Sequence, residues 1–257
     1  MNEIDLARER AQRARASVVD MAASPAGCHL GGSLSVLDIL VAAYTVAESR
    51  PGVEVVLSKG HAAAALYAVL HQTGSIEEDP APRYGRAGEP YTGHPSPKVP
   101  GVRFPTGSLG HGLAYAAGWA LSRRLLGEPG GAIAVVGDGE MQEGLVWETL
   151  QIVQAKRIGG LTVVVDVNGG QNDGYVADIS PMTDLPARLA AFGFDVIEAD
   201  GHDIEKLAAV LVPEDRPKAV LAATVKGKGV PATEGKASSH YVKISPARAK
   251  QWKAVLR

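Results

Sequence analysis

Residues 132–140 read AIAVVGDGE, and a second apolar run, LTVVVDVNGG, occupies residues 161–170. Both begin as continuous apolar stretches instead of alternating patterns, which is typical of strands buried on both faces of a parallel sheet. Three more strand-like runs are EVVL at 54–57, DVIEA at 195–199 and AVLAATV at 219–225. Because helical patterns separate the runs, the sequence predicts an α/β fold, a parallel sheet with helices on both faces.

The apolar spacing predicts helices before and between these strands. Their expected ranges are 3–24, 33–50, 62–74, 110–126, 140–156, 184–192 and 203–211. Ser33 is a candidate N-cap of the second helix, and Gly74 is expected to end the third. Residues 75–108 are rich in Pro and Gly and predict a structured loop over the functional site. We expect one domain over residues 1–257, with a loop and a short amphipathic segment at its end.

Composition excludes several classes of partner. The formal net charge is -2 and no basic run occurs, so neither nucleic acid nor an anionic membrane surface is an expected partner. The first 23 residues carry charges throughout and lack an apolar signal core. Cys28 is the single cysteine and cannot form an internal disulfide. A cytoplasmic location is therefore expected.

Asp138 stands between two glycines at the expected carboxyl end of a strand, where ligands bind in parallel sheets. A helix beginning near Glu140 would direct its free N–H groups toward the same crevice and attract a phosphate. The carboxylate would repel that phosphate unless a divalent cation lay between them. Mg²⁺ prefers oxygen ligands, and Asn168 would emerge beside Asp138 if the two strands are neighbours. The backbone carbonyl of Gly170 is a third candidate ligand.

Two other interpretations compete for this stretch. Gly and Asp are common turn formers, so Gly-Asp-Gly could be an ordinary turn. A dinucleotide-binding fingerprint requires a small residue where Gln142 stands, so that fingerprint is excluded. No phosphate-binding loop of the G-x-x-x-x-G-K-[ST] type is present either.

The segments GDGEMQEGLVWE and VVVDVNGGQNDG together resemble the signature of thiamine-diphosphate enzymes, Gly-Asp-Gly followed by Asn some thirty residues later. More narrowly, the chain resembles transketolases, because GCHLGGSLSVLDIL, VLSKGHAAAALYAVL, TGHPSPKVPGVRFPTGSLGHG, DGHD and VKGKG occur in that family's order. The resemblance extends over about residues 12–241. It covers only the family's first domain, which binds diphosphate and metal. It therefore implies the N-terminal subunit of a split transketolase, with the pyrimidine-binding and C-terminal domains on a separate subunit.

The resemblance assigns cofactor and metal roles. It implies thiamine diphosphate and Mg²⁺, with Asp138, Asn168 and the Gly170 carbonyl as metal ligands. The residues that it places beside the cofactor are His61, Gly107, Ser108, Leu109, Gly139, Glu140 and Asn168. His29 and His94 match histidines that line the family's substrate channel, and His240 is the candidate for its late histidine. Imidazoles with a pKa near neutrality suit the proton transfers of ketol transfer.

Several residues keep alternative interpretations. His71 and His202 are expected to be structural, whereas His111 could lie beside the cofactor or serve the fold. Lys226 and Lys228 could contact a phosphate or lie in a solvated turn. Cys28 stands where the family usually has Gly, so it could alter the placement of His29 and the preference for the donor.

The expected activity is transfer of a two-carbon ketol unit from a ketose or ketose phosphate to an aldose, as in transketolase, with Mg²⁺ and thiamine diphosphate. We expect activity only with the C-terminal subunit, in an α2β2 heterotetramer, on small-molecule sugars. One alternative is a specialised relative that delivers the unit to a modified sugar or a carrier thioester. The other is a non-catalytic module that binds the cofactor.

Overall fold

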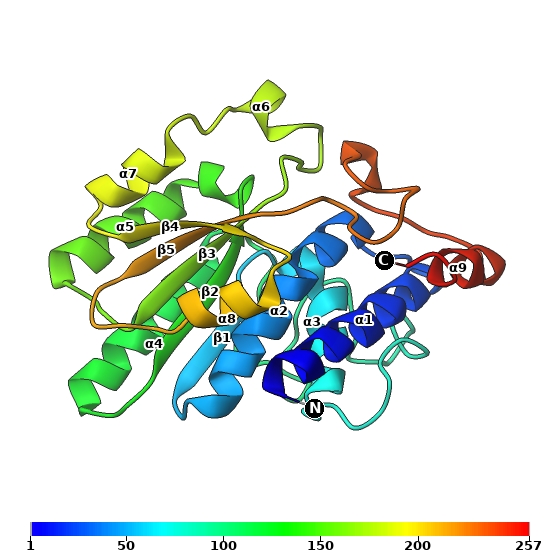
Figure 1. Ribbon diagram of the computed structural model, residues 1–257, viewed down its shortest axis with the longest axis horizontal. Coiled ribbons are helices and arrows are strands. Elements are labelled where there is room, and N and C mark those ends of the chain that lie inside the picture. Colours follow the sequence, from blue (N-terminus) through cyan, green and yellow to red (C-terminus); the bar gives the residue numbers. More distant parts are fainter. Residues whose placement is uncertain (1, 257) are drawn as a thin grey trace.

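The computed structural model describes residues 2–256 and contains one five-stranded sheet (Figure 1). Its strands are β1 (Val53–Leu57), β2 (Gly131–Gly137), β3 (Leu161–Val167), β4 (Asp195–Asp200) and β5 (Lys218–Ala223). All paired strands are parallel, and their order across the sheet is β1-β2-β3-β5-β4. Each predicted strand is present, so the predicted parallel sheet is confirmed.

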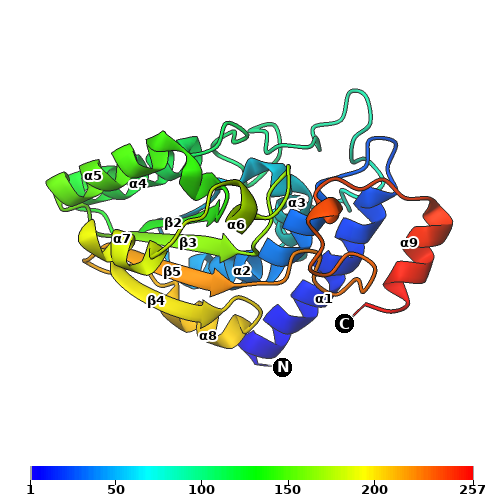
Figure 2. The same cartoon turned by 90° about the horizontal axis from the view of Figure 1, so that it is seen from above.

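The helices form a layer on each face of the sheet, as Figure 2 shows for α4 and α5 on one side and α8 on the other. They are α1 (Glu3–Ala22), α2 (Leu30–Ser49), α3 (Ala63–Gln72), α4 (His111–Leu126), α5 (Gly144–Lys156), α6 (Val176–Ile179), α7 (Leu185–Ala191), α8 (Ile204–Val210) and α9 (Pro246–Lys253). Short 3₁₀ turns lie at η1 (Gly60–Ala62), η2 (Glu140–Gln142) and η3 (Ala237–Ser239).

Alternate residues of each strand supply two separate cores. Ile133 and Val135 of β2 pack with α1, α2, α3 and α8, whereas Ala132, Ala134 and Val136 pack with α4, α5 and α7. Both faces are therefore apolar, which explains why the strand sequences are continuous apolar runs. The helices contribute many Ala and Val side chains, and these small residues let the layers approach the sheet closely.

The second predicted helix begins earlier than expected. α2 starts at Leu30 with His29 as its N-cap, and Ser33 is a buried residue inside the first turns. The prediction took Gly31 and Gly32 for a turn, but they lie in the helix, where close neighbours favour residues without a side chain. A Cβ on Gly31 would lie 2.4 Å from Ser239 Oγ, and one on Gly32 would lie 3.1 Å from His61 Nε2.

Residues 75–108 contain no helix or strand, as predicted, and they follow the edge of the α3 side of the molecule. α6 was not predicted. Among the residues described, only α2 is long and apolar enough to cross a membrane. However, 89% of its 18-residue apolar stretch is buried inside the structure. A central core helix has these same properties.

Candidate functional site

The site lies where β2 and β3 end side by side. Gly137 of β2 is paired with Asp166 of β3, and the Asp138 N–H donates to the Asp166 carbonyl at 3.2 Å. The loops that follow both strands therefore leave the sheet at the same edge. This confirms the expected adjacency of the two loops, which carry Asp138 and Asn168.

The Asp138 carboxylate joins the two loops. One oxygen accepts from its neighbour Gly139 N–H at 2.8 Å, and the other accepts from Gly169 N–H at 2.6 Å. Asp138 is buried, and no basic side chain of residues 2–256 lies within ion-pair distance of it. Burial, followed by the nearby Asp166 charge, raises the pKa of Asp138. A carboxylate in this environment is stabilised by a cation.

Asn168 and Gly170 follow on the second loop. Asn168 Oδ1 accepts from Gly170 N–H at 3.0 Å, and its amide nitrogen donates to Ser35 Oγ at 3.1 Å. The Gly170 carbonyl accepts from Lys226 Nζ at 2.8 Å. A carbonyl oxygen has two lone pairs, so this bond leaves one for another partner. The three predicted metal ligands are thus all oxygen donors of neighbouring loop segments.

A buried ion pair lies directly beneath these loops. Lys59 Nζ contacts the carboxylate of Asp166, and both side chains are almost completely buried. The same carboxylate accepts from Ser35 and Thr224 hydroxyls. Burial acts to raise the pKa of Asp166, but Lys59 and these hydrogen bonds outweigh it and lower the pKa. Asp166 is therefore a fixed anion that holds together α2, β3 and the segments that follow β1 and β5.

Histidines from separate segments form one cluster. The ring centre of His29 lies 5.5 Å from that of His61, 5.9 Å from that of His94 and 5.2 Å from that of His240. His61 and His240 are 5.3 Å apart. Tyr241 packs edge-on against His29 at 5.0 Å. The structure thus brings together all four predicted histidines, although as many as 211 positions (240 − 29) separate them in the sequence.

The cluster favours neutral imidazoles. Burial, then His94 and Lys226, lowers the pKa of His29 to about 4. Burial, then Lys226, His29 and Lys59, lowers that of His240 to about 4, and burial with Lys59 places the pKa of His61 well below its usual value. The expected pKa near neutrality is therefore wrong for His29 and His240. Their neutral rings accept hydrogen bonds near neutral pH, but they are weak bases there.

Most predicted site residues line one cavity of about 390 Å³. They are His29, His61, Gly107, Leu109, Asp138, Gly139, Glu140, Asn168, Gly170 and His240. Ser108 is exposed and does not line this cavity. His94 reaches its margin, since a Cβ on Gly107 would lie 3.0 Å from His94 Cδ2. A polar lining with cationic and anionic groups fits a charged ligand better than an apolar one.

The predicted helix start at Glu140 needs correction. The helix after β2 begins at Gly144, and residues 140–142 form a separate 3₁₀ turn. The Glu140 carboxylate accepts from Ser58 Oγ, Gly110 N–H at 2.8 Å and Gly137 N–H at 3.1 Å. These bonds join β2 to α4 through the Glu140 side chain, and Glu140 still lines the cavity.

The remaining histidines and lysines have distinct surroundings. His71 Nδ1 bonds the Ile76 carbonyl at 3.1 Å. His111 is exposed, and its Nδ1 lies 3.3 Å from the Leu109 carbonyl. This contact is compatible with a place beside the cofactor and with a structural role. His202 lies in a polar network between α2 and the loop after β5. Lys226 is not in a solvated turn: it is buried and lines the cavity. Burial, then Lys59, lowers its pKa to about 8.

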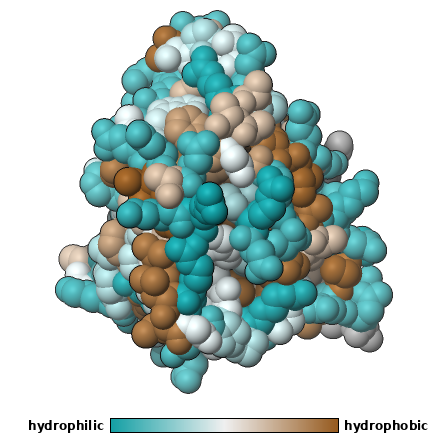
Figure 3. Space-filling view, turned by 90° about the vertical axis from the view of Figure 1, so that its left-hand side faces the viewer, coloured by the Kyte–Doolittle hydropathy of each residue, from teal (hydrophilic) through white to brown (hydrophobic). Residues whose placement is uncertain are grey.

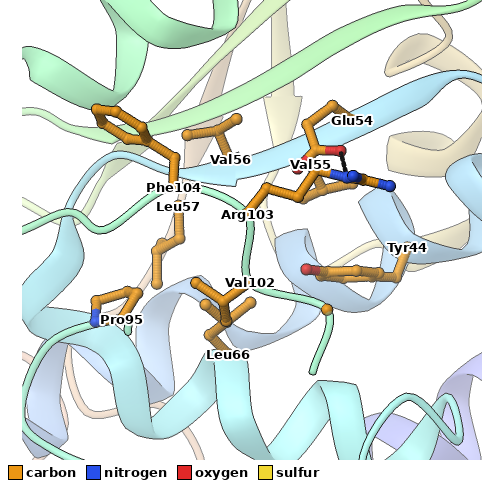
Figure 4. Close-up of a pocket in the computed structure, with 11 residues that line it drawn as sticks. Tyr44, Glu54, Val55, Val56, Leu57, Leu66, Pro95, Val102, Arg103 and Phe104 are labelled. Carbon is orange, nitrogen blue, oxygen red and sulfur yellow. Dashed lines mark ion pairs between the residues drawn. The ribbon is translucent and has the colours of Figure 1, made fainter. Parts of the chain in front are cut away.

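A much smaller cavity lies on the other side of β1, between that strand and the 95–104 segment (Figure 4). The Arg103 guanidinium and Glu54 form an ion pair across its rim at 3.0 Å. Its volume of about 10 Å³ has room for about one water molecule. This cavity cannot hold an organic cofactor.

Comparison with known proteins assigns the family. The model described as "Transketolase, thiamine diphosphate binding domain" matches residues 7–256. The chain belongs to the transketolase family. Over 241 residues it is 34% identical to the 6-deoxy-6-sulfo-D-fructose transketolase subunit SqwG of Clostridium sp., and the match covers 89% of this chain and 86% of that one. Over 239 residues it is 35% identical to one of the apulose-4-phosphate transketolase subunits, from Actinobacillus succinogenes, with 88% and 87% covered.

The transketolase fold is also seen in solved structures. The transketolase of Campylobacter jejuni superposes with a TM-score of 0.86 at 27% identity. The match covers 99% of this chain but 43% of that one. The chain therefore spans less than half the length of that transketolase, while it matches most of the length of the two subunits named above.

Thiamine diphosphate and Mg²⁺ fit the residues present. Asp138 is a buried carboxylate without a directly bound cation among residues 2–256, and Asn168 and Gly170 add uncharged oxygens, the donor types that Mg²⁺ prefers. Gly139 leaves room beside them, since a Cβ there would lie 2.9 Å from Gln171 Oε1. Lys226 supplies positive charge on the same side, which suits a diphosphate.

Lys59, Asp166 and Tyr241 were not selected from the sequence, and Lys226 was left open. The sequence could have indicated Asp166, because a single charged residue inside the apolar run LTVVVDV needs a buried partner. Lys59 precedes the Gly-His pair in SKGH, but its partner lies 107 positions away. That separation hides the pair from any local pattern.

Proposed function

We propose that this chain is the cofactor-binding subunit of a transketolase that uses thiamine diphosphate and Mg²⁺ to transfer a two-carbon ketol unit. One observation carries the proposal: the ends of β2 and β3 place Asp138 and Asn168 in the same cavity as His29, His61 and His240. Such a reaction needs oxygen ligands for the cation and side chains that can transfer protons, which imidazoles can supply. We further propose a cytoplasmic location, as its single buried cysteine suggests.

In this proposal Asp138, Asn168 and the Gly170 carbonyl hold the metal, and Gly139, His61 and Lys226 lie beside the diphosphate. Gly107 and Leu109 present their backbone on the pyrimidine side of the cavity. Bound there, the cofactor would supply a nucleophilic carbon and an electron sink for cleavage of a carbon–carbon bond. The protein orients the reactants and moves protons.

The histidines are proposed to handle the sugar's protons. His94 and His240 each lie within 6 Å of the His29 ring, measured between ring centres. A donor hydroxyl entering between them would meet imidazole nitrogens that can bond it and take part in its proton transfer. His29 Nδ1 is buried and without a hydrogen-bond partner among residues 2–256, so it is free to bond a substrate oxygen.

A partner subunit is part of the proposal, because the chain matches 43% of the C. jejuni transketolase and the relatives of its own length carry subunit names. The partner would supply the pyrimidine-binding domain, in an α2β2 heterotetramer. Exposed apolar side chains at Leu125, Leu126 and Ile152 of α4 and α5 offer surface for it to cover. Figure 3 shows separate apolar patches among hydrophilic side chains on the side of the molecule where α5 and α7 lie.

The sugar substrates form the open part of the proposal. Ordinary ketose phosphates and aldoses are the first candidates, as in pentose-phosphate metabolism. A specialised acceptor or donor is the second, because two similar proteins are named for sulfofructose and apulose phosphate. These alternatives can be separated by purifying the chain with the C-terminal subunit of a transketolase, then screening ketose donors against aldose and thioester acceptors.

The cofactor site is tested by calorimetric titration of that complex with thiamine diphosphate and Mg²⁺. We expect Asp138→Ala to lower the affinity at least 100-fold, because the remaining ligands carry no charge to hold the metal. Asp215→Ala, at the opposite edge of the sheet beside Gly159, is the matched control and should bind as wild type does. Equal affinity of Asp138→Ala and wild type would contradict the proposed metal site.

The need for two subunits is tested by activity. The chain alone is expected to transfer ketol units at less than about one percent of the rate of the mixed subunits, because in this proposal the partner supplies the pyrimidine-binding domain. Transfer by the chain alone at the full rate would refute the split arrangement. Cofactor binding without transfer in every donor and acceptor pair would instead support the non-catalytic module.

A further inference from the structure

A buried polar network outside the cavity joins α1, α2 and the segment after β4. Arg15 of α1 donates to both oxygens of Asp38 of α2, at 2.8 and 2.9 Å. Both side chains are more than 90% buried. His202, in the turn after β4, places Nδ1 2.8 Å from the same Asp38 carboxylate. Arg15 Nη2 thus bonds both carboxylate oxygens of Asp38, while Nη1 donates to backbone carbonyls.

The hydrogen bonds of His202 show which of its ring nitrogens carries the proton. The Val225 N–H donates to His202 Nε2 at 3.0 Å, so that nitrogen must be an unprotonated acceptor. Nδ1 therefore carries the proton and donates it to Asp38. In this tautomer the imidazole is a neutral link between a carboxylate on α2 and a backbone amide just after β5.

The segment that this network holds is residues 225–228. His202 binds its first amide, and Arg15 Nη1 donates to the Lys228 carbonyl at 3.3 Å. Between these two anchors lies Lys226, whose Nζ bonds the Gly170 carbonyl and lies 3.3 Å from His240 Nδ1. The network therefore fixes both sides of the residue that brings positive charge into the cavity.

We propose that Arg15, Asp38 and His202 are positioning residues for Lys226, and that through Lys226 they set the affinity of the cavity for a diphosphate. This rests on the proposed function, since it takes the ligand to be thiamine diphosphate. Lys226 has a long flexible side chain, so its charge acts at one place only if its backbone is fixed. The Gly227 N–H bond to the Gly31 carbonyl at 3.0 Å adds a third anchor.

Two substitutions of His202 separate its bond to the Val225 amide from its bond to Asp38. His202→Gln places an amide oxygen near the former Nε2 and keeps an acceptor for Val225. His202→Asn keeps a donor near the former Nδ1 for Asp38 but leaves the Val225 amide without its acceptor. If the anchor on Val225 matters, Gln preserves function and Asn does not, whereas a role confined to Asp38 predicts the reverse.

The experiment is a calorimetric titration of the two-subunit complex with thiamine diphosphate at saturating Mg²⁺. We expect His202→Asn to weaken binding about tenfold, the lower end of the effect of removing a supporting residue, and His202→Gln to weaken it less than threefold. In a Lys226→Met background, which binds more weakly throughout, His202→Asn should cause no further loss. The thermal midpoint without cofactor is recorded for each variant, to identify general destabilisation.

An equal tenfold loss from His202→Asn in both backgrounds would overturn the proposal, because the effect would then not pass through Lys226. So would a Gln variant as weak as the Asn variant, or a Lys226→Met protein with wild-type affinity. In all three cases Asp138→Ala can still abolish binding in the same assay. Failure of the positioning network is thus distinguishable from failure of the proposed cofactor site.

Discussion

At the scale of single residues, the histidine cluster shows how burial changes chemistry. The low pKa of His29, about 4, arises first from burial and then from His94 and Lys226. Each of these disfavours the imidazolium, and Nδ1 has no compensating partner among the residues described. Protonation of His29 therefore lowers the free energy of unfolding.

This predicts a pH dependence of folding. The unfolded chain protonates His29 near pH 6.5, whereas the folded chain does so near pH 4. Between these values the unfolded state binds more protons, so the free energy of unfolding falls as the pH is lowered from about 6.5 to about 4. His29→Asn removes this contribution and should make the fall shallower. Urea unfolding at pH 7 and pH 5 measures the difference, and identical falls would contradict the pKa of His29.

Single glycines also have defined structural roles. Gly31→Ala would place a Cβ 2.4 Å from Ser239 Oγ and 2.7 Å from the Ser239 carbonyl oxygen. We expect a loss of about 1–3 kcal/mol in the free energy of unfolding, because the η3 backbone must move. That movement also displaces His240. Gly118→Ala, inside α4 with open space around it, is the control and should stabilise the chain by about 0.5–1 kcal/mol. Equal effects in denaturant unfolding would contradict the close packing.

At the scale of elements, the Glu140 turn decides where α5 begins. A helix starting at residue 140 would carry this carboxylate away from the Ser58 hydroxyl and the Gly110 and Gly137 amides. Three hydrogen bonds to a buried charge outweigh the one or two helical bonds lost at a helix start. The 3₁₀ turn therefore forms, and α5 begins at Gly144.

Glu140→Gln tests this account. The amide nitrogen of Gln would face N–H or O–H donors on one side and leave at least one of them without an acceptor. We expect a loss of about 1–3 kcal/mol in the free energy of unfolding by chemical denaturation. Wild-type stability of the variant would show that the carboxylate does not hold the turn.

At the scale of the whole molecule, the cavity is formed by segments from distant parts of the chain, so ligand binding should stabilise the entire fold. At 100 times the dissociation constant, thiamine diphosphate with Mg²⁺ adds about 2.7 kcal/mol. For a chain of this size that raises the thermal midpoint by roughly 5–10 °C. Removing Mg²⁺ with a chelator should reverse the rise, and Asp138→Ala should not show it. A calorimetric scan of the two-subunit complex measures these midpoints, and a rise that persists after chelation would contradict the metal site.

The strands were predictable because each is a local apolar run, and burial on both faces leaves the same pattern wherever it occurs. Helix starts were less predictable. Ser33 is a residue type that often caps helices, yet the helix begins before it and includes Gly31 and Gly32. A Cβ at these two positions would lie close to Ser239 and His61. Those contacts come from segments far along the chain, so no local pattern could show them.

The sequence by itself determined the sheet, the family resemblance and the pairing of Asp138 with Asn168, since each depends on short motifs and on the rule that parallel strands end at one edge. Only the tertiary structure decided how the remaining side chains act. It buried Lys59 against Asp166, bonded the Glu140 carboxylate to the Gly110 amide, and placed Lys226 in the cavity. It also bound the amide of Val225, the residue before Lys226, to His202. The physical reason is that a charge acts through its nearest partners, and folding chooses those partners from residues as far apart as Arg15 and Lys228, which are separated by 213 positions.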